Sequence, residues 1–337
     1  MKKFAIIGCG AVADMHAQAI SGLENAVLYG VFDTRLESSE RFAQKHGCSV
    51  FATMEELLAC PEVDIVNICT PSGLHAKLAI EVAKAGKHII IEKPLAITKE
   101  QLDELVATVE KYNTKVEVIT QLRFAPSIRK AKKAIDEGRL GKILLADFRG
   151  KFYRSEEYYK QGGWRGTWAM DGGGALMNQG VHGVDLIQYL MGGVDSVTAI
   201  CRTLARDIET EDTAYALVEY SNGAIGSMHS TTVAAPGYPR TIEISGTKGT
   251  IKLVEDAIEV WDIEGESEEK GHTESNASSN PMDFSHTFHQ MQFADLIDAI
   301  ENDRAPMVDV YEGRKPVDII LAVYESSRTG KKVEIKS

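Results

Sequence analysis

Two short stretches of the chain carry side chains that can exchange protons. Lys93 lies in the Glu-Lys-Pro sequence at 92–94, directly after the apolar run 89–91, and His182 lies in a later glycine-rich segment. A histidine is suited to acid–base work near neutral pH, and a lysine among apolar groups can lose part of its preference for the charged form. Without further context, Lys93 could equally be a solvent-facing lysine at a strand end, and His182 could be an ordinary helix histidine.

A glycine-rich turn follows the first apolar run of the chain. The sequence Gly-x-Gly-x-x-Ala at 8–13 stands between a buried-strand pattern at 4–7 and a helix pattern. Gly8 permits the tight turn, and Gly10 lets the backbone approach a pyrophosphate at the positive end of the helix. This arrangement predicts a dinucleotide site with cofactor contacts from Gly8, Gly10, Ala11 and Val12.

The second strand pattern, at 27–32, ends on an acidic residue. Asp33 stands 20 residues after Ala13, where a carboxylate can bind both ribose hydroxyls of adenosine. Such a carboxylate favours NAD because it would repel the 2′-phosphate of NADP. NADP stays open as the alternative, because Arg35 either accepts that phosphate or is a solvated residue at a helix start. Thr34, between the two, is counted with the cofactor contacts.

The alternation of strands and helices continues to residue 121. The carboxyl ends of parallel strands face the ligand crevice, so the residues after the patterns 63–69 and 88–91 are further cofactor-side candidates. They are Thr70, Pro71, His75, Glu92 and Lys93. For His75, a residue that merely starts a helix is an equal alternative. Six strands with intervening helices predict a Rossmann dinucleotide-binding domain over residues 1–121.

Long strand patterns dominate the start of the second half, residues 122–337. Seven of them lie between 143 and 263, with turn sequences at 221–223 and 246–249. They predict an α+β substrate-binding domain with a large, open, mostly antiparallel sheet, and hence an α/β chain overall. Such a sheet needs its outer face covered, which predicts a homodimer or homotetramer. A polar, acidic loop is expected over 264–281, followed by helices at about 284–301 and 310–329.

Composition limits the partners. The net charge of −12 argues against nucleic acid and against anionic membranes. Five scattered cysteines form no metal-site pattern and suit a reducing compartment. No stretch is apolar for long enough to span a membrane, and the apolar start is too short and glycine-interrupted for a secretion signal. We therefore expect a cytoplasmic protein without a metal, whose partners are small molecules and further copies of itself.

Five motifs occur in a characteristic order. They are Gly-x-Gly-x-x-Ala at 8–13, Thr-Pro-Ser-x-x-His at 70–75, Glu-Lys-Pro at 92–94, Gln-x-Arg-Phe-x-Pro at 121–126, and Gly-x-x-x-Asn-x-x-x-His-x-x-Asp at 174–185. Together they resemble the glucose–fructose oxidoreductase / inositol dehydrogenase / rhizopine catabolism family over nearly the whole chain. The resemblance implies an NAD(P)-dependent oxidoreductase acting on a sugar or cyclitol carbinol. It also implies that Lys93 reaches towards His182, with the substrate between them over the nicotinamide.

One position departs from the family pattern. Inositol dehydrogenases of the family carry Asp where this chain has Asn178, and Asn cannot act as a base although it can bind a substrate hydroxyl. His182 is therefore the expected principal acid–base group. The run 164–182 is similar to the nucleotide-sugar 3-dehydrogenases of the family, which act on UDP-N-acetylglucosaminuronic acid. This implies an enzyme that oxidises a ring hydroxyl of a UDP-sugar to a ketone.

A UDP-sugar needs cations and aromatic faces in its binding site. The substrate-binding candidates are Arg123, Arg154, Trp164, Arg165, Asn178 and His182. The alternative for the arginine and tryptophan side chains near 154–165 is that they cover the sheet or a subunit contact. Two other functions stay open: a free-sugar or cyclitol dehydrogenase or reductase using NADP, and a non-catalytic nucleotide-sensing regulator. Intact Lys93 and His182 argue against the regulator.

Overall fold

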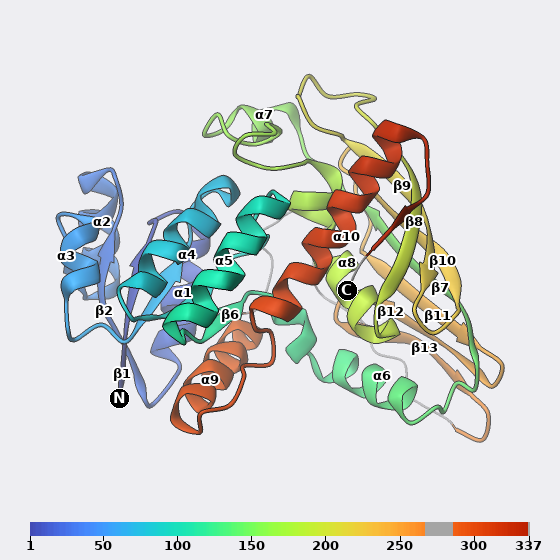
Figure 1. The fold of residues 1–337 in the computed structure, drawn as a ribbon, viewed down its shortest axis with the longest axis horizontal. Coiled ribbons are helices and arrows are strands. Elements are labelled where there is room, and N and C mark those ends of the chain that lie inside the picture. Colours follow the sequence, from blue (N-terminus) through green and yellow to red (C-terminus); the bar gives the residue numbers. More distant parts are fainter. Residues whose placement is uncertain (267–285, 336–337) are drawn as a thin grey trace. The chain divides into compact units, whose positions relative to one another are not determined.

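A computed structural model describes residues 1–266 and 286–335, and it separates the chain into two units (Figure 1). Unit 1 consists of Met1–Gln121 and Ser285–Arg314, and unit 2 consists of Leu122–Phe284 and Lys315–Ser337. From position 267 onward, the loop expected over 264–281 lies outside the described residues. Among the residues described, no helix has both the length and the apolar character needed to cross a membrane.

Unit 1 is built on a six-stranded parallel sheet. Its order is β3-β2-β1-β4-β5-β6, and every neighbouring pair is parallel. The strands are β1 (Lys2–Ile7), β2 (Ala26–Phe32), β3 (Ser49–Val50), β4 (Ile65–Ile68), β5 (His88–Ile91) and β6 (Val116–Val118). The apolar runs of β1, β4 and β5 are buried because helices cover both faces of such a sheet. The order 3-2-1-4-5-6 confirms the predicted Rossmann domain.

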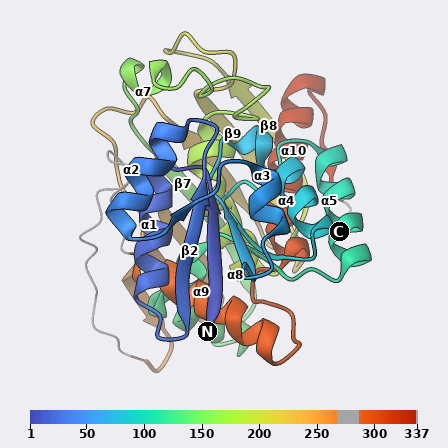
Figure 2. The ribbon, with the colours of Figure 1, turned by 90° about the vertical axis from the view of Figure 1, so that its left-hand side faces the viewer.

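Helices connect these strands. They are α1 (Ala11–Ser21), α2 (Leu36–His46), α3 (Met54–Ala59), α4 (His75–Lys84) and α5 (Lys99–Tyr112). Figure 2 shows α1 and α2 on one side of β1 and β2, and α4 and α5 on the other. The hydroxyls of Thr53 and Thr98 cap α3 and α5, accepting hydrogen bonds from the backbone N–H groups of Glu56 and Gln101.

A late segment of the chain returns to unit 1. Helix α9 (Thr287–Glu301) buries Phe293, Leu296 and Ile297 in the same core as Phe4. Its Gln292 amide donates to the carbonyl of Val118 at 2.7 Å, beside β6. The expectation that all of 122–337 forms the second domain is therefore wrong for 285–314. The sequence could not reveal this, because the apolar pattern of a helix shows which of its residues are buried but not which core they pack against.

Unit 2 is built on an eight-stranded sheet of order β13-β12-β11-β7-β10-β9-β8-β14. Only β7 and β10 pair in parallel, which confirms the expected mostly antiparallel sheet. The strands are β7 (Ile143–Lys151), β8 (Val194–Arg202), β9 (Thr213–Tyr220), β10 (Ile225–Thr231), β11 (Thr241–Gly246), β12 (Gly249–Val254), β13 (Ala257–Ile263) and β14 (Val333–Glu334).

One face of this sheet is covered by helical segments. They include α6 (Pro126–Asp136), a π-helical turn η3 (Ala175–Gly180) and α8 (Val181–Met191). A Cβ atom at Gly183 of α8 would lie 2.0 Å from the Phe148 ring of β7, so only glycine allows this close approach. The short α7 (Glu156–Lys160) follows β7, and α10 (Val310–Thr329) is shared by the two units.

Truncating Phe293 to alanine tests whether α9 belongs to the core of unit 1. Phe293 is fully buried and its ring stacks on that of Phe4 at 6.1 Å, so Phe293→Ala is expected to lower the free energy of unfolding by about 3–5 kcal/mol. Urea unfolding measures the loss. The matched control is Met291→Ala on the same helix, where 36% of the residue is exposed and the expected change is below about 0.5 kcal/mol. Equal losses in the two variants would contradict the assignment.

Candidate active site

The turn after β1 has the geometry that a dinucleotide site requires. Gly8 has φ +93°, and a Cβ atom there would lie 2.7 Å from the carbonyl oxygen of Cys69. Gly10 precedes α1 and is exposed, and no atom of the described residues lies within 4 Å of its Cβ position. Gly8 is therefore needed for the turn itself, and Gly10 leaves room for a ligand at the helix start. Ala11 is exposed and Val12 half-buried beside it.

The acid at the end of β2 is held against this turn. One Asp33 oxygen accepts the Cys9 N–H at 2.9 Å, and the other accepts the Arg35 N–H at 2.9 Å. The Arg35 guanidinium is 76% exposed, with its Nε 3.6 Å from the carboxylate. Thr34 is also exposed. The carboxylate is thus fixed beside the glycine turn, while Arg35 points into solvent.

Lys93 follows β5 and is half-buried, as are Thr70 and Pro71 after β4. The Lys93–Pro94 peptide bond is cis. His75 lies below this loop with 1% of its surface exposed, and its ring nitrogens lie 2.7 Å from the Pro94 carbonyl and 2.8 Å from the Thr70 carbonyl. Burial lowers the pKa of His75, and the two carbonyl acceptors oppose that change. Both nitrogens thus bind carbonyls inside the unit and support the loop, and the expected cofactor contact of His75 stays a prediction.

Glu92 also supports the loop. Only 6% of its surface is exposed, one carboxylate oxygen lies 3.0 Å from His16 Nε2, and the other accepts the Lys93 N–H at 3.2 Å. Burial alone would raise its pKa, but the hydrogen bond and charge of His16, together with the charge of Lys93, lower it to about 2. The expected direct contact of Glu92 with the cofactor stays a prediction.

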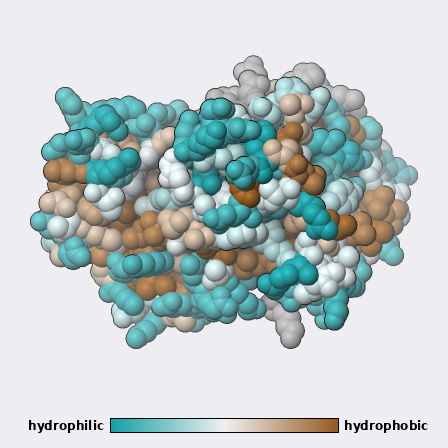
Figure 3. Space-filling model, turned by 90° about the horizontal axis from the view of Figure 1, so that it is seen from above, coloured by the Kyte–Doolittle hydropathy of each residue, from teal (hydrophilic) through white to brown (hydrophobic). Residues whose placement is uncertain are grey.

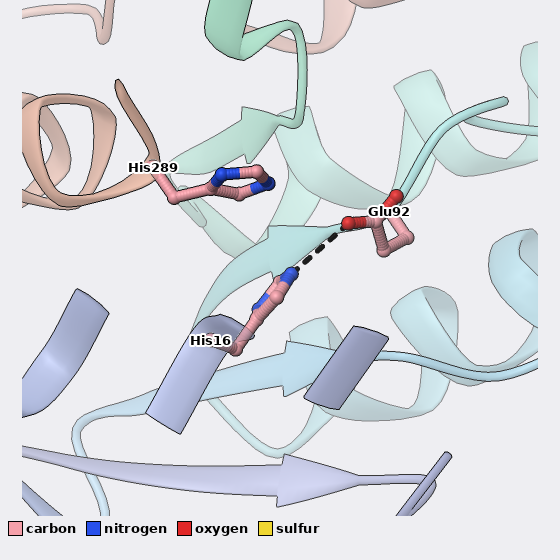
Figure 4. Close-up of side chains that lie close together, drawn as sticks. All are labelled: His16, Glu92 and His289. Atoms are coloured by element: carbon pink, nitrogen blue, oxygen red, sulfur yellow. Dashed lines mark hydrogen bonds and ion pairs between the residues drawn. The ribbon is translucent and has the colours of Figure 1, made fainter. Parts of the chain in front are cut away.

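Two histidines near Glu92 were not predicted from the sequence. His16 of α1 and His289 of α9 are both buried beside it (Figure 4). A histidine two turns into a phosphate-binding helix gave a weak signal for His16. His289 gave none, because it lies about 200 residues after Glu92 and reaches it only through the return of α9.

In unit 2, a polar network surrounds the π-helical turn before α8. Asn178 donates from its amide to Asp171 at 2.5 Å and accepts from the Gln179 amide at 2.8 Å. Gln179 in turn accepts from Arg154 Nη2 at 2.7 Å and donates to the Tyr158 hydroxyl at 2.8 Å. Arg154 is 3% exposed and belongs to this network, and its expected substrate contact stays a prediction.

Arg123 is a second buried arginine. Its Nε and Nη2 donate to the two oxygens of Asp185 at 2.9 and 2.6 Å, and its guanidinium lies over the Tyr189 ring at 4.6 Å. With 1% of its surface exposed, it joins the segment before α6 to α8, and the expectation that it binds substrate stays a prediction. Asp185 of the last motif is thereby explained as its partner.

Three candidates keep more accessible positions in unit 2. His182 is half-buried in the first turn of α8. Arg165 and Trp164 are half-buried, and the Arg165 guanidinium lies 4.6 Å from the Tyr158 ring and 5.0 Å from the Trp164 ring. Arg165, Trp164 and Tyr158 therefore form a cluster of one cation and two aromatic rings, and its predicted role in substrate binding stays a prediction.

Glu211 is a further buried acid that was not predicted. It accepts the Leu176 N–H at 2.8 Å, the Gly174 N–H at 3.0 Å and the Tyr324 hydroxyl at 2.8 Å. Burial outweighs these hydrogen bonds and raises the pKa of Glu211 to about 7. The side chain fixes the start of the π-helical turn, which leads to Asn178 and His182.

Replacing Glu211 by glutamine tests this titration. A raised pKa favours the protonated acid in the folded state, so the stabilisation is complete below pH 4.5 and is lost as the pH rises through about 7. From pH 4.5 to 8, the free energy of unfolding of the wild type is expected to fall on the order of 3 kcal/mol further than that of Glu211→Gln. Urea unfolding at both pH values measures the difference, and the pH-independent cost of the altered contact to Gly174 cancels. A difference that stays constant with pH would contradict the raised pKa.

Two family models match the chain in order. Residues 2–120 match the oxidoreductase family with an NAD-binding Rossmann fold, and residues 128–252 match the GFO/IDH/MocA C-terminal domain. The chain is 29% identical over 256 residues to the inositol 2-dehydrogenase of Rhizobium meliloti, covering 74% of each chain. It is 31% identical over 241 residues to the levoglucosan dehydrogenase of Pseudarthrobacter phenanthrenivorans, covering 64% of this chain and 60% of that one.

Solved structures extend the likeness to the whole chain. The WlbA dehydrogenase from Bordetella pertussis, in complex with NADH and UDP-GlcNAcA, is 32% identical with a TM-score of 0.90, over 100% of this chain and 98% of that one. A levoglucosan dehydrogenase in complex with NADH and levoglucosan is 25% identical with a TM-score of 0.88, over 100% of both chains. The chain therefore belongs to the GFO/IDH/MocA family and is an NAD-dependent oxidoreductase of its sugar and cyclitol dehydrogenase group.

Proposed function

We propose that this enzyme oxidises a ring hydroxyl of a UDP-sugar to a ketone and transfers the hydride to NAD. The observation that carries the proposal is the 32% identity to the WlbA dehydrogenase over the full length of the chain, since that protein was solved with NADH and UDP-GlcNAcA. The levoglucosan dehydrogenase structure is 25% identical over the full length, and the levoglucosan dehydrogenase of Pseudarthrobacter phenanthrenivorans is 31% identical over only 64% of this chain. A free-sugar or cyclitol substrate is the second candidate.

The cluster around Arg165 supports a nucleotide-sugar substrate. Arg165 Nη1 donates to the Gln161 carbonyl, whereas its buried Nε–H has no hydrogen-bond partner among the described residues. A buried donor without a partner is costly, and a diphosphate oxygen would satisfy it while the Trp164 face accepts a ring. A free sugar offers no comparable anion.

Lys93 and His182 are the proposed catalytic residues. In the oxidation, the C–H hydride passes to the nicotinamide and the hydroxyl proton passes to His182, leaving the ketone. In this proposal the Lys93 ammonium polarises the reacting oxygen. Asp33 beside the glycine turn supports NAD over NADP, because a 2′-phosphate there would meet a carboxylate. The cytoplasmic location expected from the cysteines stays a prediction.

Substrate turnover with variants of both residues tests the proposal. The wild type is expected to form NADH, followed at 340 nm, from UDP-N-acetylglucosaminuronic acid at least about 100-fold more efficiently than from levoglucosan or myo-inositol. Lys93→Met and His182→Gln are each expected to lower kcat by about 10²–10⁴-fold, because the acid–base step is lost. Fluorescence titration should show NADH binding within about threefold of wild type.

The matched control is Lys99→Met, an exposed lysine at the start of α5 that should keep full activity. If levoglucosan or inositol is turned over in preference to the UDP-sugar, the second candidate function, a free-sugar or cyclitol dehydrogenase, replaces the first. Unchanged kcat in both site variants would overturn the assigned roles. NADH binding without turnover of any sugar would favour the non-catalytic regulator.

We also propose that a second copy of the chain covers the outer face of the unit 2 sheet. Exposed apolar side chains follow its central strands, and the register pairs Ile200 with Tyr215 and Leu145 with Ile225. Leu217 of β9 lies on the same face and is 61% exposed. Figure 3 shows hydrophobic side chains on the side of unit 2 where Figure 1 labels β10. Exposed apolar side chains on this face, with polar residues such as Ser227 and Asp147 between them, fit a symmetric subunit contact.

A glutamate on that face tests the contact. Leu217→Glu buries a charge in the proposed interface and is expected to convert a dimer or tetramer into a smaller species, seen by light scattering after size-exclusion chromatography. Gln44→Glu adds the same charge at an exposed site on α2 and should leave the mass unchanged. An unaltered mass for Leu217→Glu would contradict this interface.

A further inference from the structure

The Glu92 carboxylate connects two elements of unit 1 through a short path. Its Oε1 lies 3.0 Å from Nε2 of His16 on α1 (Figure 4). Its Oε2 accepts the backbone N–H of Lys93 at 3.2 Å. His16 is fully buried and Glu92 is 6% exposed. Helix α1 begins at the glycine turn, so the helix that faces the cofactor phosphates and the loop that carries Lys93 share one polar network.

The direction of the central hydrogen bond follows from the partners of the His16 ring. Its Nδ1 lies 2.9 Å from the amide Nδ2 of Asn67 on β4. An ionised carboxylate can only accept, so His16 must donate from Nε2 to Glu92 whichever way the Asn67 amide is turned. Asn67 thus orients the ring, and the ring orients the carboxylate.

The other side of the loop is held in the same way. His75 contacts the Pro94 carbonyl at 2.7 Å, directly after Lys93. Lys93 is therefore bracketed by two buried histidines, His16 acting through Glu92 and His75 acting on Pro94. Only the His16 side adds a negative charge, that of Glu92.

The interaction between Glu92 and Lys93 is also electrostatic. The Lys93 charge contributes to the low pKa of Glu92, and because the attraction is mutual, the carboxylate stabilises the Lys93 ammonium. Other titratable groups face Glu92: His289 from α9, His75 from α4 and Cys69 after β4. These side chains are retained in every variant below.

We propose that His16 is a positioning residue for Lys93: it keeps Glu92 ionised and oriented, and Glu92 fixes the Lys93 backbone and charge. This role rests on the proposed function of Lys93. Loss of Glu92 removes a negative charge beside the ammonium, and loss of His16 removes the hydrogen bond and charge that keep Glu92 ionised, so in both cases Lys93 is expected to become neutral at lower pH.

The same side chains raise a different explanation. Ligand atoms of His16, Glu92 and His289 lie within 4.8 Å of one another, close enough to surround a metal ion. The geometry favours the hydrogen-bonded network, because Nε2 of His16 points its hydrogen at Glu92 and a metal would need that nitrogen unprotonated. Metal content of the purified protein is therefore part of the test.

The experiment follows the reactivity of Lys93 without any substrate. Trace acetylation of the full-length protein from pH 7 to 11, read by mass spectrometry of the Lys93 peptide, gives the midpoint of its titration. Glu92→Gln and His16→Phe are expected to shift this midpoint down by about one pH unit, and His16→Gln, which keeps an N–H donor, should restore most of it. In the enzyme assay, the first two variants should lower kcat about 10-fold or more, with NADH affinity within about threefold.

His46→Gln is the matched control. His46 forms the same kind of pair with Asp14, at 2.7 Å between α2 and α1. In His46→Gln, the midpoint of the Lys93 titration should stay within about 0.2 pH units of that in the wild type. Where His16→Phe does not fold, Glu92→Gln tests the same step with little change in shape.

The outcomes separate this inference from the proposed function. Shifted midpoints support the positioning role even if no UDP-sugar is turned over, because the labelling needs no substrate. Unshifted midpoints in both Glu92→Gln and His16→Phe would overturn it even if UDP-sugars are oxidised. One equivalent of metal in the wild type that is lost in His16→Phe would also overturn it in favour of a metal site.

Discussion

All six strands of unit 1 run in one direction, and the candidate cofactor site depends on that constraint. Parallel strands bring their carboxyl ends to a single edge, so the turn at Gly8, the carboxylate of Asp33, and the loops at Thr70 and Lys93 gather there from four separate stretches of sequence. No long-range side-chain contact is needed to collect them. The hydrogen-bonded register of buried apolar strands does so, and this explains why short motifs after strands are informative about a ligand site.

Two buried acids show how differently a protein can use a carboxylate. Glu92 faces the donor and charge of His16 and the charge of Lys93, and its pKa falls to about 2. Glu211 receives only neutral donors, from Leu176 N–H, Gly174 N–H and the Tyr324 hydroxyl, and its pKa rises to about 7. Burial raises the pKa of both acids, so the difference lies in whether a cationic group compensates for it. Each acid fixes the backbone beside a proposed catalytic residue.

Burial also divides the candidate residues into two kinds. Arg123, Arg154, His75 and Glu92 have the right chemistry for a site, yet each is buried and bonded to a neighbour in its own unit. Lys93, His182 and Arg165 are half-buried. Charged groups enter an interior only when paired, so a polar residue within a motif is as often the support of a functional side chain as the functional side chain itself.

The sequence alone determined the Rossmann unit, the mostly antiparallel second sheet and the motifs after β1, β2, β4 and β5, because strand periodicity and turn glycines are local signals. It also determined the family, because five ordered motifs are more specific than any one of them. Only the tertiary structure decided that α9 belongs to unit 1, that Asp185 pairs with Arg123, and that His16 holds Glu92. These facts join residues between 62 and almost 300 positions apart, and no local pattern encodes which buried polar group will meet which partner.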